Sequence, residues 1–155
     1  MGNVEPGTEN RPYSYRNLIL WQKAQALTLR IIEIVSRLPR QPAAQVIARQ
    51  VVRSSSSIAA NIAEGHGRFS IPAHRNHLSI AKGSACETDS WLDLMRGAGY
   101  IEPDVERELH DACEEVIRML TAKIVQLERK GKSDARIGEA VAPYTVEDYA
   151  ASERF

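Results

Sequence analysis

Apolar side chains recur at spacings of three and four residues through much of the sequence. Over residues 15–38 they form two adjacent rows, made of Trp21, Ala24, Thr28, Ile31, Val35 and Leu38 and of Leu20, Leu27 and Ile34. That spacing matches the 3.6-residue turn of an α-helix, so residues 15–38 are predicted to form a helix with a wide apolar face. Pro39 and Pro42 end it, because proline has no amide donor and clashes with the preceding turn.

The next apolar row, over residues 43–65, is built from short side chains. Its predicted buried positions are Ile47, Val51, Ser54 or Ser55, Ile58 and Ile62, flanked by Ala48, Val52, Ala59 and Ala63. Such short side chains let the helix backbone approach a neighbouring helix closely, whereas Leu or Phe would hold the two axes apart. Gly65 and Gly67 suit the left-handed turn that closes a helix, so this helix is predicted to end there.

Two more helices follow the same rules. Ser70 is a good N-cap and Pro72 suits a first turn, where no amide hydrogen is needed, so a third helix is predicted to run to Gly97. Its buried row is Leu78, Ala81, Ala85, Thr88, Leu92 and Met95. A fourth begins at residues 102–103, with acids in its first turns as the helix dipole favours, and is predicted to end at Gly131. Its buried row is Leu109, Val116, Leu120, Ile124 and Leu127.

These four helices and their short connections predict an all-α fold. No useful length of sequence alternates with the period of two that a strand requires, so we expect an antiparallel up-down four-helix bundle over residues 15–130. Residues 1–14 are interpreted as a flexible leader. Residues 131–155 are interpreted as a C-terminal tail that is flexible or docked on a partner. The tail side chains available for docking are Tyr144, Val146, Tyr149 and Phe155.

Composition is that of a soluble globular domain. The chain is 43% hydrophobic and 26% charged, which argues against wholesale disorder. No apolar run approaches the roughly 18 residues of a membrane span, and the first residues lack the hydrophobic segment of a signal peptide. We therefore expect a cytoplasmic protein. In that compartment Cys86 and Cys113 are interpreted as small core residues, since they show neither disulfide context nor metal-ligand spacing.

Charge is balanced overall but unevenly distributed. The chain has 20 Lys and Arg against 20 Asp and Glu. Residues 37–75 hold six arginines against one acid, a net of +5, and residues 102–118 hold seven acids against two arginines, a net of −5. We expect two sides of opposite charge. Such a distribution favours an anionic partner or self-association through unlike faces.

A basic row is the most regular functional pattern of the sequence. Cations recur every seventh residue from Arg16 to Arg37, which places them along one side of a helix over about 31 Å. Such a row neutralises phosphates without reading sequence, and RNA and DNA are both candidates. The other interpretation is a solvated helix face, in which Glu33 pairs with neighbouring arginines. The residues predicted to contact nucleic acid are Arg16, Lys23, Arg30, Arg37, Arg49, Arg53, Arg68 and Arg75.

Other chemistry has weaker support in the sequence. A phosphate loop places its glycines after a strand, and here they follow a helix. A metal site would use Glu64, His66, His74 and His77, but the familiar His-Glu-x-x-His spacing is absent. A serine nucleophile within residues 54–57 needs an oriented base and an oxyanion hole, which a helix interior does not offer. We therefore expect no enzyme, no metal and no cofactor.

Two polar residues of the predicted second helix lie close to its tightly packed row. Asn61 and Glu64 must be hydrogen-bonded or charge-paired if they are buried, because an unpaired polar group costs on the order of 1–3 kcal/mol. Arg68, one turn beyond Glu64, is its nearest partner in sequence. We expect these two residues to be structural.

Several motifs carry a family resemblance. They are LILWQKA at residues 18–24, RQVVRS at 49–54, SIAANIAEGHGR at 57–68, LSIAKGSACE at 78–87, and Gly99-Tyr100. Together they resemble the bacterial four-helix-bundle family of rRNA intervening-sequence proteins. The same superfamily includes the accessory variability protein of diversity-generating retroelements. The resemblance covers residues 15–130 and excludes the leader and tail.

The resemblance implies a bundle that assembles as a homopentameric, barrel-like ring. Some members lie in insertions of large-subunit rRNA genes without established activity, and the retroelement members bind a reverse transcriptase and its RNA through basic surfaces. This chain departs from that pattern because its positive and negative charges are equal in number. The leading hypothesis is a non-enzymatic scaffold that binds nucleic acid and a protein partner, as the accessory subunit of a retroelement reverse transcriptase. The alternative is a protein-interaction module that binds no nucleic acid.

Overall fold

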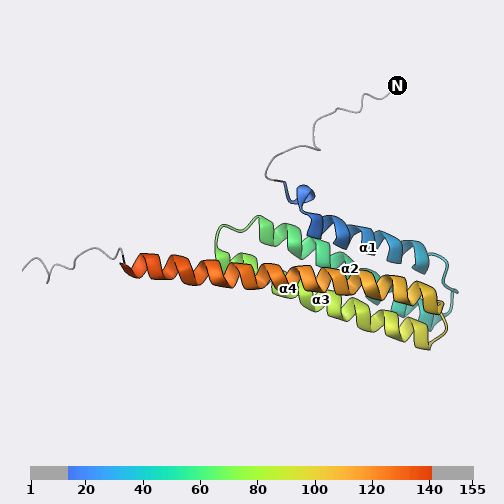
Figure 1. Ribbon diagram of the computed structural model, residues 1–155. Coiled ribbons are helices and arrows are strands. Elements are labelled where there is room, and N and C mark those ends of the chain that lie inside the picture. The colour runs from blue at the N-terminus through green and yellow to red at the C-terminus, as the bar shows by residue number, and fades with distance from the viewer. Residues whose placement is uncertain (1–13, 141–155) are drawn as a thin grey trace, which may run out of the picture.

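The computed structural model describes residues 14–140, with side chains described as far as residue 135. The elements are a short 3₁₀ helix, η1 (Tyr15–Asn17), and four α-helices: α1 (Ile19–Val35), α2 (Pro42–His66), α3 (Ile71–Gly97) and α4 (Pro103–Ala140). Over the described range there is no strand. Figure 1 shows the four helices side by side, which confirms the predicted all-α four-helix bundle. None of the described helices is both long enough and apolar enough to cross a membrane.

Each of the four helices packs against two of the others. Helix α1 contacts α2 and α4, and α3 contacts the same two helices, so α1 and α3 lie at diagonal corners of the described bundle. The most extensive of these contacts joins α2 to α3. Short connections make consecutive helices antiparallel, as an up-down bundle requires.

The core follows the predicted rows. Every position in the predicted row of α3 is buried, as are Ala24, Leu27, Thr28 and Ile31 of α1. The remaining predicted α1 positions are partly buried and pack against this core. In α2 the short residues are buried: Ala44, Ala48, Val51, Ser54, Ser55, Ile58, Ala59, Ile62 and Gly65. In α4 the buried residues include Cys113, and burial raises the pKa of its thiol to about 12. The expectation for Cys86 was wrong, because its side chain is exposed.

The first helix is shorter than the pattern predicted. Leu18 has an extended backbone, with φ −74° and ψ 119°, and separates η1 from α1. The Ser14 hydroxyl accepts a hydrogen bond from the Arg16 amide at 3.2 Å, which caps η1. The α-helix ends at Val35, before the prolines, and tighter backbone hydrogen bonds close the turn beyond it.

Helix α2 ends at His66 with Gly67 as its C-cap, as predicted, but without the predicted left-handed turn. Gly67 has φ −79°, and among the described residues Gly99 alone has a positive φ, at 71°. Gly65 lies inside the helix, where it serves close packing. A Cβ at this position would lie 3.0 Å from the Cβ of His77 and 3.3 Å from the carbonyl oxygen of His74. The glycine therefore lets the end of α2 approach α3.

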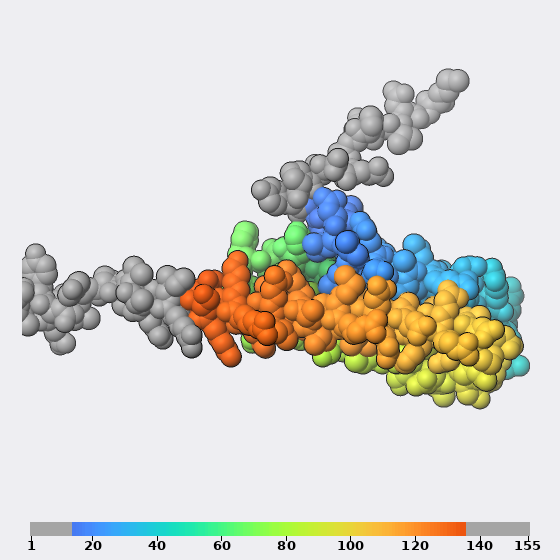
Figure 2. Space-filling model, in the orientation of Figure 1, coloured from blue at the N-terminus to red at the C-terminus, as the bar shows by residue number. Residues whose placement is uncertain are grey.

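Helix α4 continues well past its predicted end at Gly131. It extends to Ala140, because Gly131 keeps a helical conformation and no proline follows until Pro143. A Cβ on Gly131 would lie 3.6 Å from Cγ2 of Ile71, the first residue of α3. The rest of α4 extends beyond the bundle, as the orange-to-red end in Figures 1 and 2 shows. Residues 1–13 of the predicted leader (1–14) and residues 141–155 of the predicted tail (131–155) lie outside the described residues.

Candidate functional site

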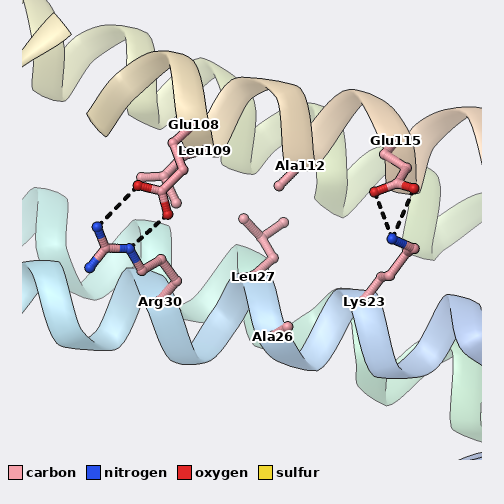
Figure 3. Close-up of a pocket in the computed structure, with 8 residues that line it drawn as sticks. All are labelled: Lys23, Ala26, Leu27, Arg30, Glu108, Leu109, Ala112 and Glu115. Carbon is pink, nitrogen blue, oxygen red and sulfur yellow. Dashed lines mark hydrogen bonds and ion pairs between the residues drawn. The ribbon is translucent and has the colours of Figure 1, made fainter. Parts of the chain in front are cut away.

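The basic row of α1 faces α4. Lys23 Nζ lies 2.9 Å from both carboxylate oxygens of Glu115. Arg30 binds Glu108 through two hydrogen bonds, Nε to Oε1 at 2.8 Å and Nη2 to Oε2 at 3.0 Å. Figure 3 shows both pairs bridging the two helices. Two cations seven residues apart on α1 thus meet two carboxylates seven residues apart on the antiparallel α4.

This pairing satisfies the charges without placing them in the core. The hydrogen bond from Arg30 is the main cause that lowers the pKa of Glu108, and the same contacts raise the pKa of Arg30. Arg30 also donates to Glu33 at 2.9 Å, and Arg37 binds the other oxygen of Glu33 at 2.7 Å. These side chains are between a third and three quarters exposed, so solvent screening keeps the contribution of each pair to stability small. The interhelical pairs favour α1 and α4 as neighbours, whereas the pairs of Glu33 are local in sequence.

A shallow cavity of about 250 Å³ lies between the two interhelical pairs. Its floor is apolar, with Leu27 pointing toward α4 beside Leu109 and Ala112 (Figure 3). The charged groups at its two ends are already matched within the chain. The cavity offers no unpaired acid, base or nucleophile, so it has no evident chemistry.

The other predicted cations are spread over separate surfaces. Arg53 pairs with Glu87 of α3, Arg68, just after α2, with Glu64 in the last turn of that helix, and Arg75 with Glu128 of α4 at 3.5 Å. Arg16 lies over the ring of Tyr15, with 4.8 Å between Cζ and the ring centroid. Arg49 is exposed and makes no ion pair with any residue in the described range. The eight cations therefore do not form one continuous patch in a single copy of the chain.

A line of polar contacts, here called the α2–α3 seam, joins the two most closely packed helices. Ser54 Oγ lies 2.9 Å from Thr88 Oγ1, and Ser84 Oγ donates to Ser57 Oγ at 3.0 Å. Asn61 donates to the Ser57 carbonyl oxygen at 2.9 Å. Each hydroxyl or amide thus has a partner at the point where only short side chains fit.

The seam ends in a histidine held from both sides. His77 Nδ1 lies 3.3 Å from Asn61 Oδ1, and Arg68 Nε donates to His77 Nε2 at 3.2 Å. A neutral imidazole with its proton on Nδ1 satisfies both contacts, because the Asn61 oxygen only accepts and the Arg68 nitrogen only donates. Glu64 binds Arg68 in turn. Asn61 and Glu64 thus take part in bonds between and along the helices, as expected of structural residues.

The seam does not have the geometry of a catalytic centre. The hydroxyls of Ser54, Ser55 and Ser56 donate to carbonyl oxygens three residues earlier in α2. The other bonds of the seam's hydroxyls go to hydroxyl, amide or carbonyl groups, not to a histidine or carboxylate. Within the range that the structure describes, no three His, Cys, Asp or Glu side chains gather as a metal ion requires.

A second histidine contact, which sequence reasoning missed, joins α3 to α4. His110 Nδ1 lies 2.8 Å from Asp89 Oδ1, and Nε2 lies 3.7 Å from Glu114. The hydrogen bond with Asp89 is the largest cause that raises the pKa of His110. The residues are 21 apart in sequence, so no local spacing marks them as partners.

The described geometry defines a four-helix bundle whose polar and charged groups bind one another both within and between helices. A model of the 23S rRNA-intervening sequence protein family matches residues 16–122. The chain belongs to this family. The match ends before Lys123, so the last turns of α4 lie outside the matched region.

Solved structures match this chain, and one of them illustrates the similarity in fold and sequence. It is a protein of unknown function from the S23 ribosomal protein family of Bacteroides thetaiotaomicron VPI-5482, determined at 1.70 Å resolution. It is 28% identical in sequence, with a TM-score of 0.65, and the alignment covers 68% of this chain and 98% of that one. A search of curated proteins found no match.

His110 and His74 are expected to titrate on opposite sides of the ordinary histidine pKa of 6.5. Asp89 raises the pKa of His110, whereas burial, followed by the charges of Lys123, His66 and His77, lowers that of His74. The His110 contact therefore stabilises the fold below pH 6.5, and this contribution is lost as pH rises through the raised pKa.

Histidine NMR signals followed against pH measure both values. Asp89→Asn should lower the pKa of His110 and leave that of His74 unchanged. A wild-type His110 that titrates below His74 would contradict the described geometry.

Proposed function

We propose that this protein is a non-enzymatic scaffold that associates with copies of itself and binds nucleic acid and a protein partner. The observation that carries the proposal is a pair of unpartnered apolar faces at diagonal corners of the bundle. One lies on α1 and the other on α3. Apart from Trp91, which is partly buried against the core, the residues of these faces are exposed in a single copy.

The α1 face comprises Ile19, Leu29 and Ile32, whose residues are 62%, 65% and 44% exposed. The α3 face comprises Ile80, Trp91 and Leu94, of which Ile80 and Leu94 are 45% and 48% exposed. Singly exposed apolar residues are common on protein surfaces and need no explanation. On α3 the three residues recur at spacings of 11 and 3, which keeps them on one side of the helix, and on α1 Leu29 and Ile32 are neighbours at a spacing of three. Such stripes are typical of surfaces that another protein covers.

The two faces differ in composition and point away from each other, so contact between them is heterologous. A heterologous contact leaves one face free on each copy and continues until the chain of copies closes into a ring or grows as a filament. This supports the ring expected from the family resemblance. The number of five copies comes from the resemblance alone.

The nucleic-acid half of the proposal uses the cations that remain accessible, first Arg49 and Arg53 of α2. A ring would repeat each such cluster once per copy, and affinity for phosphate rises with the number of contacts made together. The protein partner implied by the retroelement members of the superfamily is a reverse transcriptase.

A second candidate function is a protein-interaction module without nucleic-acid binding. The specific observation in its favour is charge pairing, because six of the eight predicted cations already bind a carboxylate of the same chain. A paired cation must exchange its carboxylate for a phosphate, which reduces the gain from binding. Nucleic-acid titration separates the two candidates.

Self-association is tested by sedimentation velocity or native mass spectrometry with one variant per face. The α1-face variant is Leu29→Ser with Ile32→Ser, and the α3-face variant is Ile80→Ser with Leu94→Ser. Wild-type protein should form a closed oligomer, and each variant alone should be monomeric. Because each variant keeps one intact face, an equimolar mixture should form a heterodimer and nothing larger.

Val125→Ser, at a 38% exposed residue of α4, is the matched control and should assemble like wild type. A monomeric wild-type protein would exclude the scaffold. Normal assembly of both face variants would place the interface elsewhere.

Nucleic-acid binding is tested by titrating labelled RNA at about 50 and 200 mM salt. Affinity should fall steeply with salt, as release of counterions requires. Changing Arg30, Arg49 and Arg53 together to Glu should weaken binding about tenfold or more at the lower salt concentration. The control reverses three exposed cations elsewhere, Arg96, Arg107 and Arg118, and should change affinity much less. Absence of wild-type binding at low salt would leave the protein-interaction module as the function.

A further inference from the structure

The end of the bundle where α4 extends past its neighbours carries a groove. It has a volume of about 470 Å³ and lies between the first turn of α3 and the last described turns of α4. Its apolar lining comes from Ile71 and Pro72 on α3 and from Leu127, Gly131 and Ala135 on α4. The groove exists because α4 continues while α3 begins at Ile71, and because Gly131 places no side chain in it. Leu127 is the last buried residue of α4 in the described range.

Charges of both signs line the groove, and further cations lie around it. Arg75 and Lys132 line it together with Glu128 and Asp134, and Arg129 and Lys130 lie on the exposed sides of the same turns of α4. Arg129, Lys130 and Lys132 are exposed and form no ion pair with the described residues, while Arg75 has a single 3.5 Å contact with Glu128.

The local balance of charge is positive. Residues 64–77 and 123–134, which meet at this end, contain six Lys and Arg against three Asp and Glu, besides three histidines. The cations of α1, by contrast, face matching carboxylates of α4. Unpaired cations around an apolar floor favour a partner that is both anionic and able to bury flat apolar surface.

An exposed aromatic residue precedes the first residue of the groove in sequence. Phe69 is fully exposed in the connection between α2 and α3, two residues before Ile71. Phenylalanine is usually buried in a folded protein. A fully exposed phenylalanine close to cations is therefore a candidate for contact with a ligand. Proteins that bind single-stranded nucleic acid combine a positively charged groove with aromatic side chains on which bases stack.

We propose that Phe69 and this groove form a binding site for single-stranded nucleic acid. One base stacks on Phe69, a neighbouring base lies on the apolar floor beside Ile71 and Leu127, and Arg75 and Lys132 bind the intervening phosphates. Arg129 and Lys130 extend the phosphate path along α4. The inference rests on the nucleic-acid half of the proposed function and gives it a substrate class. A duplex suits the site less, because its bases are already stacked and their faces are covered.

The site depends on a part of the chain outside the family match. Gly131, Lys132 and the other α4 residues of the groove follow residue 122, where that match ends. A bundle that ended at the same level as the start of α3 would lack one wall of the groove. The α4 wall of the proposed site therefore lies outside the matched region, while its α3 wall lies inside it.

The experiment is fluorescence anisotropy with labelled single strands of about 20 nucleotides, as RNA and as DNA, and with the matching blunt duplex. Reversing three cations together, Arg129→Glu, Lys130→Glu and Lys132→Glu, should weaken single-strand binding at least tenfold. It should also reduce the slope of log affinity against log salt by about 2, since each phosphate contact on a single strand contributes roughly 0.7. The three reversals at Arg96, Arg107 and Arg118 are the control and should leave both quantities near wild type.

Two further variants test the apolar part of the site without changing charge. Phe69→Ala should weaken single-strand binding by about tenfold and leave duplex binding unchanged. Phe69→Trp should bind single strands as tightly as wild type does. Gly131→Leu fills the groove and should also weaken single-strand binding. Both positions tolerate the change, since Phe69 packs on nothing and Leu favours a helix more than Gly does. Circular dichroism confirms that each variant is folded.

The outcomes separate this site from the wider function. No binding by wild type overturns the site together with the nucleic-acid half of the proposed function. If changing Arg30, Arg49 and Arg53 abolishes binding and reversing the three α4 cations leaves it unchanged, the site is overturned and the nucleic-acid half of the proposed function stands. Equal binding of duplex and single strand, unaffected by Phe69→Ala, also overturns it. Displacement of the strand by poly-glutamate as efficiently as by an unlabelled strand would assign the groove to an acidic protein instead.

Discussion

Close approach of α2 and α3 is the constraint on which the rest of the structure depends. It requires short side chains along α2, a hydroxyl or amide partner for each polar group that becomes enclosed, and no Cβ at Gly65. Close packing adds dispersion contacts that a looser bundle lacks, and satisfied hydroxyl pairs avoid the cost of buried unpaired groups. With α2 and α3 fixed in this way, α1 and α4 complete the bundle on one side. The apolar faces of α1 and α3 are then left at opposite corners.

Charge decides which surfaces remain available for partners. The first half of α4 is acidic, and two of its carboxylates bind the basic row of α1. Ion pairs this exposed contribute little to stability, but mismatched neighbours would place like charges together, so they favour one arrangement of helices. The last turns of α4 carry cations instead and have no α1 beside them. Unpaired positive charge therefore gathers at the end of the bundle where α4 extends alone.

Most of the fold was predictable because each helix of the bundle is amphipathic in sequence. The row from Leu78 to Met95 identified the buried side of α3, and Ser70 identified its start through a hydrogen bond that the structure contains, from the Ala73 amide to the Ser70 hydroxyl at 3.3 Å. The roles of the glycines were predicted less well, because a glycine can end a helix, allow close packing or lie within a helix. In the sequence, Gly65 and Gly131 both resemble glycines that end a helix. In the structure Gly65 allows close packing, and Gly131 lies within a helix that continues. Only the three-dimensional neighbours, His77 and Ile71, distinguish these roles.

The candidate site was less predictable, because it depends on pairing across the bundle. The heptad spacing of Lys23 and Arg30 was visible in the sequence, as was the equal spacing of Glu108 and Glu115. Recognising them as partners requires the antiparallel register of α1 and α4, which sequence alone left open. Phe69 and the cations after Leu127 could not be recognised as a site for a related reason. They form one only because α4 extends past the start of α3, and the sequence predicted that α4 ends at Gly131.

The most direct measurement of the central claim is the free energy of unfolding of Gly65→Ala beside that of Gly83→Ala, determined in urea. Alanine favours a helix over glycine by about 1 kcal/mol, and a Cβ at Gly83 meets no atom within 4 Å, so Gly83→Ala should stabilise the protein by about 0.5–1 kcal/mol. At Gly65 the new Cβ meets the His77 Cβ and the His74 carbonyl, neither of which can move without its backbone. Gly65→Ala should therefore destabilise by about 1–3 kcal/mol, the usual cost of overpacking. Equal stabilisation by both substitutions would show that α2 and α3 do not approach as described, and would contradict the account.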